Sequence, residues 1–284
     1  HRAALEQMGY QIDIDTLKSR DDPAFLWQEL QRILAARERA IGHFWKEDWD
    51  YFEFVFTGTD RLHHFLWNAY DDTAHHYHRS FLDYYARIDK VIDTFSASFR
   101  AMTGGLDNLF VLSDHGFCQI EQEVYLNAWL EQQGYLKFEV LAPTGLDEIS
   151  AGSVAFALDP NRIYLNLKDR FPRGEVGYAE KGTLRREIRQ KLEQLEYAGK
   201  KVIRKVFEAE DIYSGPLVSM GPDLIVLSKP GFDLKGSVKK KEVFGRTSLQ
   251  GMHTWDDAFF LAHRSYGQDL AISGLAQIIR QVYS

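Results

Sequence analysis

The spacing of hydrophobic and polar residues predicts two long helices in the first part of the chain. Asp22 followed by Pro23 is typical of a helix start, because Asp caps free N–H groups and Pro at the first helical position loses no needed donor. Apolar residues at helical spacing extend this helix over 23–41. The same spacing predicts a helix over 78–102, which ends at the pair Gly104-Gly105.

Two short apolar runs, at 51–56 and 108–112, predict buried strands rather than helices. Strand, helix and strand with a crossover of this length are typical of a parallel sheet covered by helices. The expected fold class is therefore α/β, with a mostly parallel sheet flanked by helices. Ligands in such folds bind at the carboxyl ends of strands, so we expect chemistry in GTDRLHH and SDHGF, which follow these two runs.

The middle of the chain has shorter elements. Strands are predicted at 154–158 and 162–167, then a polar helix, then a further strand pair that ends in PDLIVLS. We expect a small α+β insertion at 135–222 within one domain that covers 1–284, and expect the chain to return to the main sheet at 224–227. The tail at 271–283 is predicted to be a closing helix.

Composition excludes several classes of protein. The 284 residues are 45% hydrophobic and 26% charged, which is typical of a globular chain with a large core. A net charge of −7 argues against a nucleic-acid polymer or an anionic membrane as partner. No apolar run approaches the roughly 20 residues that span a bilayer. The single cysteine, Cys118, fits a reducing compartment, so a cytoplasmic location is expected. The chain begins without Met, and we expect a natural N-terminus to be missing.

Three separate signals indicate metal ligands. Asp60 and His64 are four residues apart, which places them on one face if a helix begins there. Asp114 and His115 follow the second predicted strand, and Gly116 permits a sharp turn. His253 stands near a glycine in QGMHTWDD. Each signal also has an ordinary interpretation: a chance Asp-x-x-x-His, a helix cap beside a surface histidine, or a structural histidine.

The segments TGTDRLHHFLW, VLSDHGF and LQGMH resemble, in their order, the type I phosphodiesterase/nucleotide pyrophosphatase branch of the alkaline phosphatase superfamily. The resemblance implies an alkaline phosphatase-like fold and two divalent metal ions, usually zinc, although manganese or iron would also suit the ligands. It implies that Asp60, His64 and His253 hold one metal, and that Asp114 and His115 hold part of the second. The implied substrate is a small phosphate ester or a nucleotide. The oligomeric state cannot be inferred from the sequence.

The same resemblance implies an attacking Thr or Ser near the start of the domain, beside another metal-binding Asp. Asp13, Asp15 and Thr16 lie in YQIDIDT, but the surrounding pattern does not match that segment. The nucleophile, one metal ligand and the first strand of the sheet are therefore expected to be absent. We expect the chain alone to bind one metal well, to bind the second poorly, and to hydrolyse little.

The leading functional hypothesis is a phosphodiesterase or nucleotide pyrophosphatase that uses two metals. A phosphomonoesterase or a phosphoglycerate mutase-like enzyme would share the metal framework. A third hypothesis is a non-catalytic domain that has kept the fold and one metal site.

Overall fold

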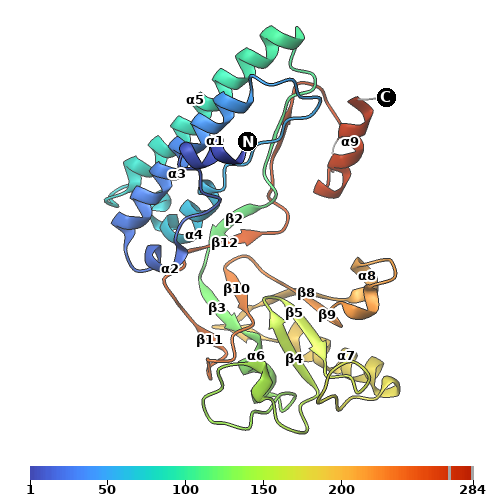
Figure 1. The fold of residues 1–284 in the computed structure, drawn as a ribbon. Coiled ribbons are helices and arrows are strands. Elements are labelled where there is room, and N and C mark those ends of the chain that lie inside the picture. The colour runs from blue at the N-terminus through green and yellow to red at the C-terminus, as the bar shows by residue number, and fades with distance from the viewer. Residues whose placement is uncertain (268–269, 283–284) are drawn as a thin grey trace. The chain divides into compact units, whose positions relative to one another are not determined.

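The computed structural model describes residues 1–267 and 270–282, which form two compact units. The first unit comprises residues 1–119 and the chain from Ser248 onward, and the second comprises Ile120–Thr247. Figure 1 labels the elements along the chain. The chain is a mixed α/β protein.

The first unit contains the predicted helices. Its helices are α1 (Arg2–Gln7), α2 (Thr16–Ser19), α3 (Pro23–Phe44), α4 (Gly58–Asp71), α5 (His78–Thr103) and α9 (Leu275–Val282). The prediction for α3 is confirmed, since the Asp22 carboxylate accepts a hydrogen bond of 2.9 Å from the Phe25 N–H and Pro23 is the first helical residue. The prediction for α5 is also confirmed, and this helix ends at Gly104 in the left-handed conformation.

Helices α3, α4 and α5 form the core of the first unit. Their apolar stripes bury side chains against one another, as the helical spacing requires. The buried residues of this core include Leu26, Leu30 and Ile33 of α3, Leu62 and Leu66 of α4, and Phe81 and Tyr84 of α5. This packing fixes α4, and with it the segment that carries Asp60 and His64.

Four short strands of the first unit form two antiparallel pairs. β1 (Phe110–Leu112) pairs with β13 (Phe260–Ala262), and β2 (Gly116–Gln119) pairs with β12 (Gly251–Thr254). The prediction of a strand at 108–112 is confirmed for its last three residues. These ladders bring the end of the described chain back to the segment that follows α5.

The prediction of a strand at 51–56 is wrong. The exposure of the segment alternates as in a strand, with Phe52, Phe54 and Phe56 on the half-buried side. A strand also needs a neighbouring backbone to pair with, and among the described residues no strand pairs with this segment. The Val55 carbonyl instead accepts a hydrogen bond of 3.1 Å from Nε of Arg37.

The expected mostly parallel sheet is not formed by the described residues. A crossover gives a parallel pair only when both strands join one sheet, and segment 51–56 forms no strand that could lie beside β1. Of the strand pairs in the described part of the chain, β3 with β10 is parallel and the others are antiparallel.

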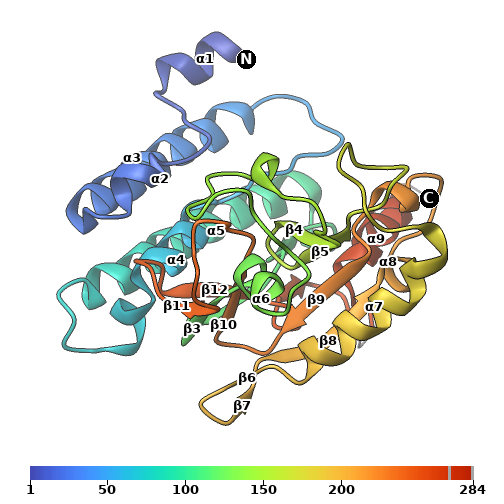
Figure 2. The ribbon, with the colours of Figure 1, turned by 90° about the horizontal axis from the view of Figure 1, so that it is seen from below.

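The second unit has its own sheets and core. Its strands are β3 (Gln122–Tyr125), β4 (Ala155–Asp159), β5 (Arg162–Leu165), β6 (Glu196–Tyr197), β7 (Lys200–Lys201), β8 (Ile203–Glu208), β9 (Leu224–Ser228), β10 (Phe232–Lys235) and β11 (Phe244–Gly245). Its helices are α6 (Leu126–Gln132), α7 (Tyr178–Glu193) and α8 (Ala209–Ile212). Strands β4, β5, β9 and β8 form a four-stranded sheet in that order, and α7 packs on β8 (Figure 2).

The predicted strands and helix of the middle region are present in this unit. However, the expected return to the main sheet at 224–227 is wrong, because β9 pairs with β5 on one side and β8 on the other. Buried apolar residues of the two neighbouring strands, such as Ile163 of β5 and Val206 of β8, hold β9 within this sheet. An apolar run fixes the presence of a strand but not its neighbours.

The predicted closing helix is confirmed as α9, which follows a short 3-10 turn at Ile272–Gly274; Tyr283 lies outside the described residues. None of the helices that the structure describes is both long enough and apolar enough to cross a membrane.

The end of α5 provides a test of the backbone conformation. Gly104 has a φ of +81°, which a side chain disfavours, whereas the φ of neighbouring Gly105 is not in the left-handed region. A Cβ on either glycine would meet open space. We expect Gly104→Ala to lower the free energy of unfolding by about 1 to 2 kcal/mol. Gly105→Ala is the matched control and should leave urea denaturation nearly unchanged. Equal effects of the two substitutions would contradict the assigned helix end.

Candidate metal centre

The candidate site lies in the first unit and is built from three segments of the chain. Asp60 and His64 stand one turn apart on α4, with Asp60 in its first turn, where the helix dipole favours a carboxylate. His115 lies between β1 and β2, and His253 lies in β12. The pairing of β12 with β2 brings His253 beside the segment of His115. The expected i, i+4 placement on a helix is therefore observed.

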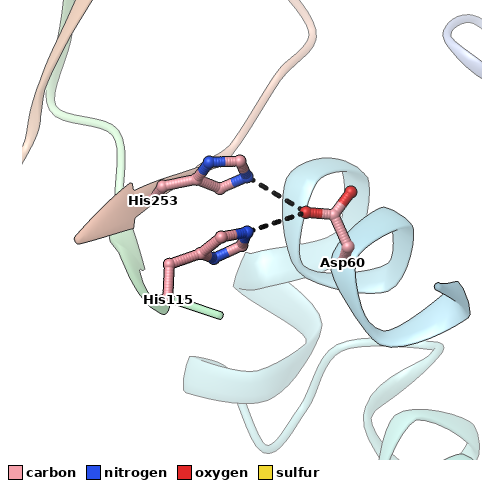
Figure 3. A group of neighbouring side chains, drawn as sticks. All are labelled: Asp60, His115 and His253. Carbon is pink, nitrogen blue, oxygen red and sulfur yellow. Dashed lines mark hydrogen bonds and ion pairs between the residues drawn. The ribbon is translucent and has the colours of Figure 1, made fainter. Parts of the chain in front are cut away.

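One carboxylate oxygen, Oδ1 of Asp60, is the centre of the group. It lies 3.0 Å from Nε2 of His253, 3.6 Å from Nε2 of His64 and 3.8 Å from Nε2 of His115. Figure 3 shows His115 and His253 pointing toward this oxygen from the strand side. Asp60, His115 and His253 form a group whose ligand atoms all lie within 4.8 Å of one another.

The protonation of His64 suits a metal ligand. Its Nδ1 lies 2.8 Å from the Gly251 carbonyl oxygen, so Nδ1 carries the proton and donates it, which leaves a lone pair on Nε2. Burial lowers the pKa of His64, although the Asp60 carboxylate opposes this, so the ring is neutral at pH 7. Nε2 of His64 also lies 3.0 Å from Nε2 of His253. Two imidazole nitrogens and a carboxylate oxygen thus converge on one point.

Asp60 is ionised at neutral pH. Burial alone would raise its pKa, but the hydrogen bond from His253 and the charge of Arg61 hold the pKa below its usual value. An ionised carboxylate beside imidazole nitrogens is a donor set that zinc and similar divalent ions accept. The residues present therefore fit a divalent cation.

An aromatic ring that the sequence analysis missed supports the histidines. Phe117 lies directly opposite His253 in the β2–β12 ladder. Its ring centroid is 4.9 Å from those of His64 and His253 and 5.3 Å from that of His115. The rings of His115 and His253 are stacked with centroids 3.6 Å apart. The sequence could have indicated this contact through the phenylalanine that follows Asp-His-Gly, because an apolar residue at that strand position must pack against its cross-strand partner.

Two glycines allow the segments to approach. A Cβ on Gly251 would lie 2.4 Å from the His63 carbonyl oxygen, and one on Gly116 would lie 2.4 Å from the Asp257 carbonyl oxygen. The expectation that Gly116 permits a sharp turn needs correction, because its φ is not in the left-handed region. Both glycines are required by close backbone contacts, which any side chain would disrupt.

Asp114 is placed differently from the other predicted ligands. Its side chain is 78% exposed, and its Oδ1 lies 3.5 Å from Nε2 of His115. His115, by contrast, points toward Asp60. The structure therefore brings together Asp60, His64, His115 and His253, with Asp114 at the edge of the group.

His63, next to His64, has a structural role. Burial lowers its pKa to about 4. Its Nε2 lies 3.0 Å from the Tyr85 hydroxyl, and its ring packs among Trp67, Phe81 and Phe117. His63 therefore joins α4 to α5, while His64, the next residue of α4, points to the site.

A comparison with known protein families bears on this geometry. The family model for type I phosphodiesterase / nucleotide pyrophosphatase matches residues 5–256. The chain belongs to this family. The match confirms the resemblance seen in the sequence, and it includes all five predicted ligands. A comparison with curated proteins gave no match.

Membership places the chain in a family of metal-dependent hydrolases that act on phosphate esters. The group around Asp60 is a candidate metal-binding site in keeping with that chemistry. Both observations favour a hydrolase over a binding module of another class.

Gly251 offers a test of how the site is assembled. Gly251→Ala should force β12 away from the α4 backbone, because the new Cβ would clash with the His63 carbonyl. We expect the free energy of unfolding to fall by about 1 to 3 kcal/mol and zinc binding to weaken, measured by urea denaturation and titration calorimetry. Gly42→Ala is the matched control, since a Cβ at that position on α3 meets open space. Zinc affinity equal to that of the unsubstituted protein would contradict the close approach.

Proposed function

We propose that this protein hydrolyses phosphodiester or nucleotide pyrophosphate bonds at a site that holds two divalent metal ions. The observation that carries the proposal is the convergence of His64, His115 and His253 on Oδ1 of Asp60. Ionised carboxylates rarely stand partly buried among several imidazoles unless the group binds a cation or reacts. The family match supplies the class of reaction.

In this proposal Asp60, His64 and His253 hold one metal, and Asp114 and His115 contribute to the second. The first set is supported by its short distances and by the Gly251 carbonyl that orients His64. Zinc suits three such nitrogen and oxygen donors best, and manganese or iron are the alternatives. Bound metal would activate an attacking hydroxyl and stabilise charge on the phosphate oxygens.

The chain's own residues prepare that chemistry. His64 is kept neutral with its lone pair free, and Asp60 is kept ionised, so both are ready to bind a cation without losing a proton. The Phe117 ring packs against the imidazoles of His64 and His253 and helps to hold their orientation.

We further propose that the two units belong to one catalytic domain, with 135–222 as its insertion. The family match covers residues 5–256 and so includes parts of both units, which supports this assignment. We also propose that the 284-residue chain hydrolyses its substrate weakly, since no Thr or Ser before Asp60 matches the family's nucleophile segment.

A second candidate function is a domain that binds one metal without catalysis. The exposure of Asp114 favours it, because a side chain 78% exposed is poorly placed to complete a second site. Weak or absent loading of a second metal would agree with either candidate. Hydrolysis that depends on metal distinguishes them.

Metal loading and hydrolysis together test the proposal. The zinc-loaded chain should bind about one ion tightly and a second one weakly, measured by elemental analysis. It should hydrolyse bis(4-nitrophenyl) phosphate slowly and faster than 4-nitrophenyl phosphate, and a chelator should abolish the reaction, because the metal supplies the electrostatic stabilisation. His253→Ala should remove both the tight zinc and the hydrolysis, since it deletes a ligand of the better-formed site.

His43→Ala on α3 is the matched control and should retain both properties, because His43 lies in the last turn of α3 and is absent from the ligand group. Hydrolysis that survives the chelator, or zinc retained by His253→Ala, would contradict the proposed site. Near-equal loading of both metals, or rapid turnover, would contradict the expectation of a weak enzyme.

A further inference from the structure

Arg61, the residue after Asp60, connects the candidate metal site to the beginning of the chain. Its Nη1 lies 3.1 Å from Oδ2 of Asp60. Its Nε and Nη2 donate to the carboxylate of Asp13 at 3.0 Å and 2.6 Å. One guanidinium therefore bridges two carboxylates that are far apart in the sequence.

The bridge determines which oxygen of Asp60 is available. Arg61 contacts Oδ2, whereas the nearest imidazole nitrogens lie around Oδ1. A carboxylate on a flexible side chain can rotate and exchange its two oxygens, which weakens any site that depends on one of them. With Oδ2 held by a planar guanidinium, the carboxylate keeps Oδ1 directed at His253 and His64.

Arg61 is not placed to bind a substrate phosphate. A guanidinium recognises phosphate best through the paired N–H groups along one edge. That edge, Nε with Nη2, is occupied by Asp13, and Nη1 is turned to Asp60. The geometry thus favours a role that acts through Asp60 over direct contact with the substrate.

Asp13 is itself held in place. Its Oδ1 accepts a hydrogen bond of 2.8 Å from the N–H of Ile14. The neighbouring backbone is fixed by Arg37, which is 2% exposed and donates to the Ile12 carbonyl at 2.7 Å and to the Thr57 hydroxyl at 2.7 Å. The buried guanidinium of Arg37 therefore joins the segment of Asp13 to the residue before α4. This arrangement gives Arg61 a rigid partner.

We propose that Arg61 and Asp13 are a positioning pair that sets the orientation of Asp60 for cation binding. The inference rests on the proposed function, since it assumes that Asp60 is a metal ligand. It adds two residues outside the predicted ligand set, one of them in the segment YQIDIDT.

Charge alone gives the opposite expectation for Arg61, which makes the proposal testable. Removing a positive charge beside a cation site should strengthen cation binding if only Coulomb interactions matter. Removing the residue that orients Asp60 should weaken it. Asp13→Asn should weaken cation binding through both effects. It deletes a negative charge near the cation, and it releases Arg61, which then no longer orients Asp60.

The experiment is zinc titration calorimetry on the full 284-residue chain and on Arg61→Met, Arg61→Lys and Asp13→Asn, with cobalt absorption spectra as a second readout. Arg87→Met is the matched control. Arg87 forms a similar pair with Glu38 between α5 and α3, and its side chain is 34% exposed against 30% for Arg61. This control measures the loss of such a pair away from the metal site.

We expect Arg61→Met to weaken zinc binding by about 10- to 100-fold, in the range found when partners of metal ligands are removed. Arg61→Lys should recover part of this loss, since one ammonium donor can still reach a single oxygen. The cobalt spectrum should change in Arg61→Met and stay unchanged in Arg87→Met.

Zinc affinity of Arg61→Met equal to or above that of the unsubstituted chain would overturn the inference and leave the proposed function intact. If Arg61→Met does not fold by circular dichroism, unchanged affinity in both Arg61→Lys and Asp13→Asn would overturn it instead. An unsubstituted chain that binds no zinc would contradict the proposed function itself, and the inference with it.

Discussion

The candidate metal centre of the first unit depends on holding one ionised carboxylate, that of Asp60, among imidazoles at the edge of a helical core. A carboxylate that loses water needs partners, and here they come from α4 itself and from two distant segments. The β2–β12 ladder brings His253 to Asp60, and Gly251 lets that ladder approach the backbone of α4. The Asp60 carboxylate is ionised and the His64 ring is neutral, so both side chains suit a cation.

Local features of the fold could be predicted from the sequence. The cap at Asp22, the apolar stripe of α3 and the glycine stop of α5 each depend on residues within a few positions of one another. The pair Asp60 and His64 could be predicted for the same reason, since α4 places residues four apart on one face. His253 could be linked to them only through the family resemblance, because its contact spans 193 positions of sequence.

Features that depend on long-range partners could not be predicted from periodicity. The segment 51–56 has the alternation of a strand, but its backbone has no strand beside it among the described residues. Likewise, β9 was predicted as a strand and assigned to the wrong sheet. The bridge from Asp13 through Arg61, across 48 positions, has no local signature. The exposure of Asp114 also depends on how the segment between β1 and β2 lies, which no motif encodes.

We propose that Asp60, His64 and His253 bind a single cation. X-ray absorption at the zinc edge, on the chain loaded with one equivalent of zinc, tests it most directly. We expect a ligand shell of nitrogen and oxygen at about 2.0 to 2.2 Å, with scattering from at least two imidazole rings, and no such shell in His253→Ala, which should not retain the zinc. A shell of oxygen alone, without imidazole scattering, would show that zinc binds to surface carboxylates and would contradict the proposed ligand set.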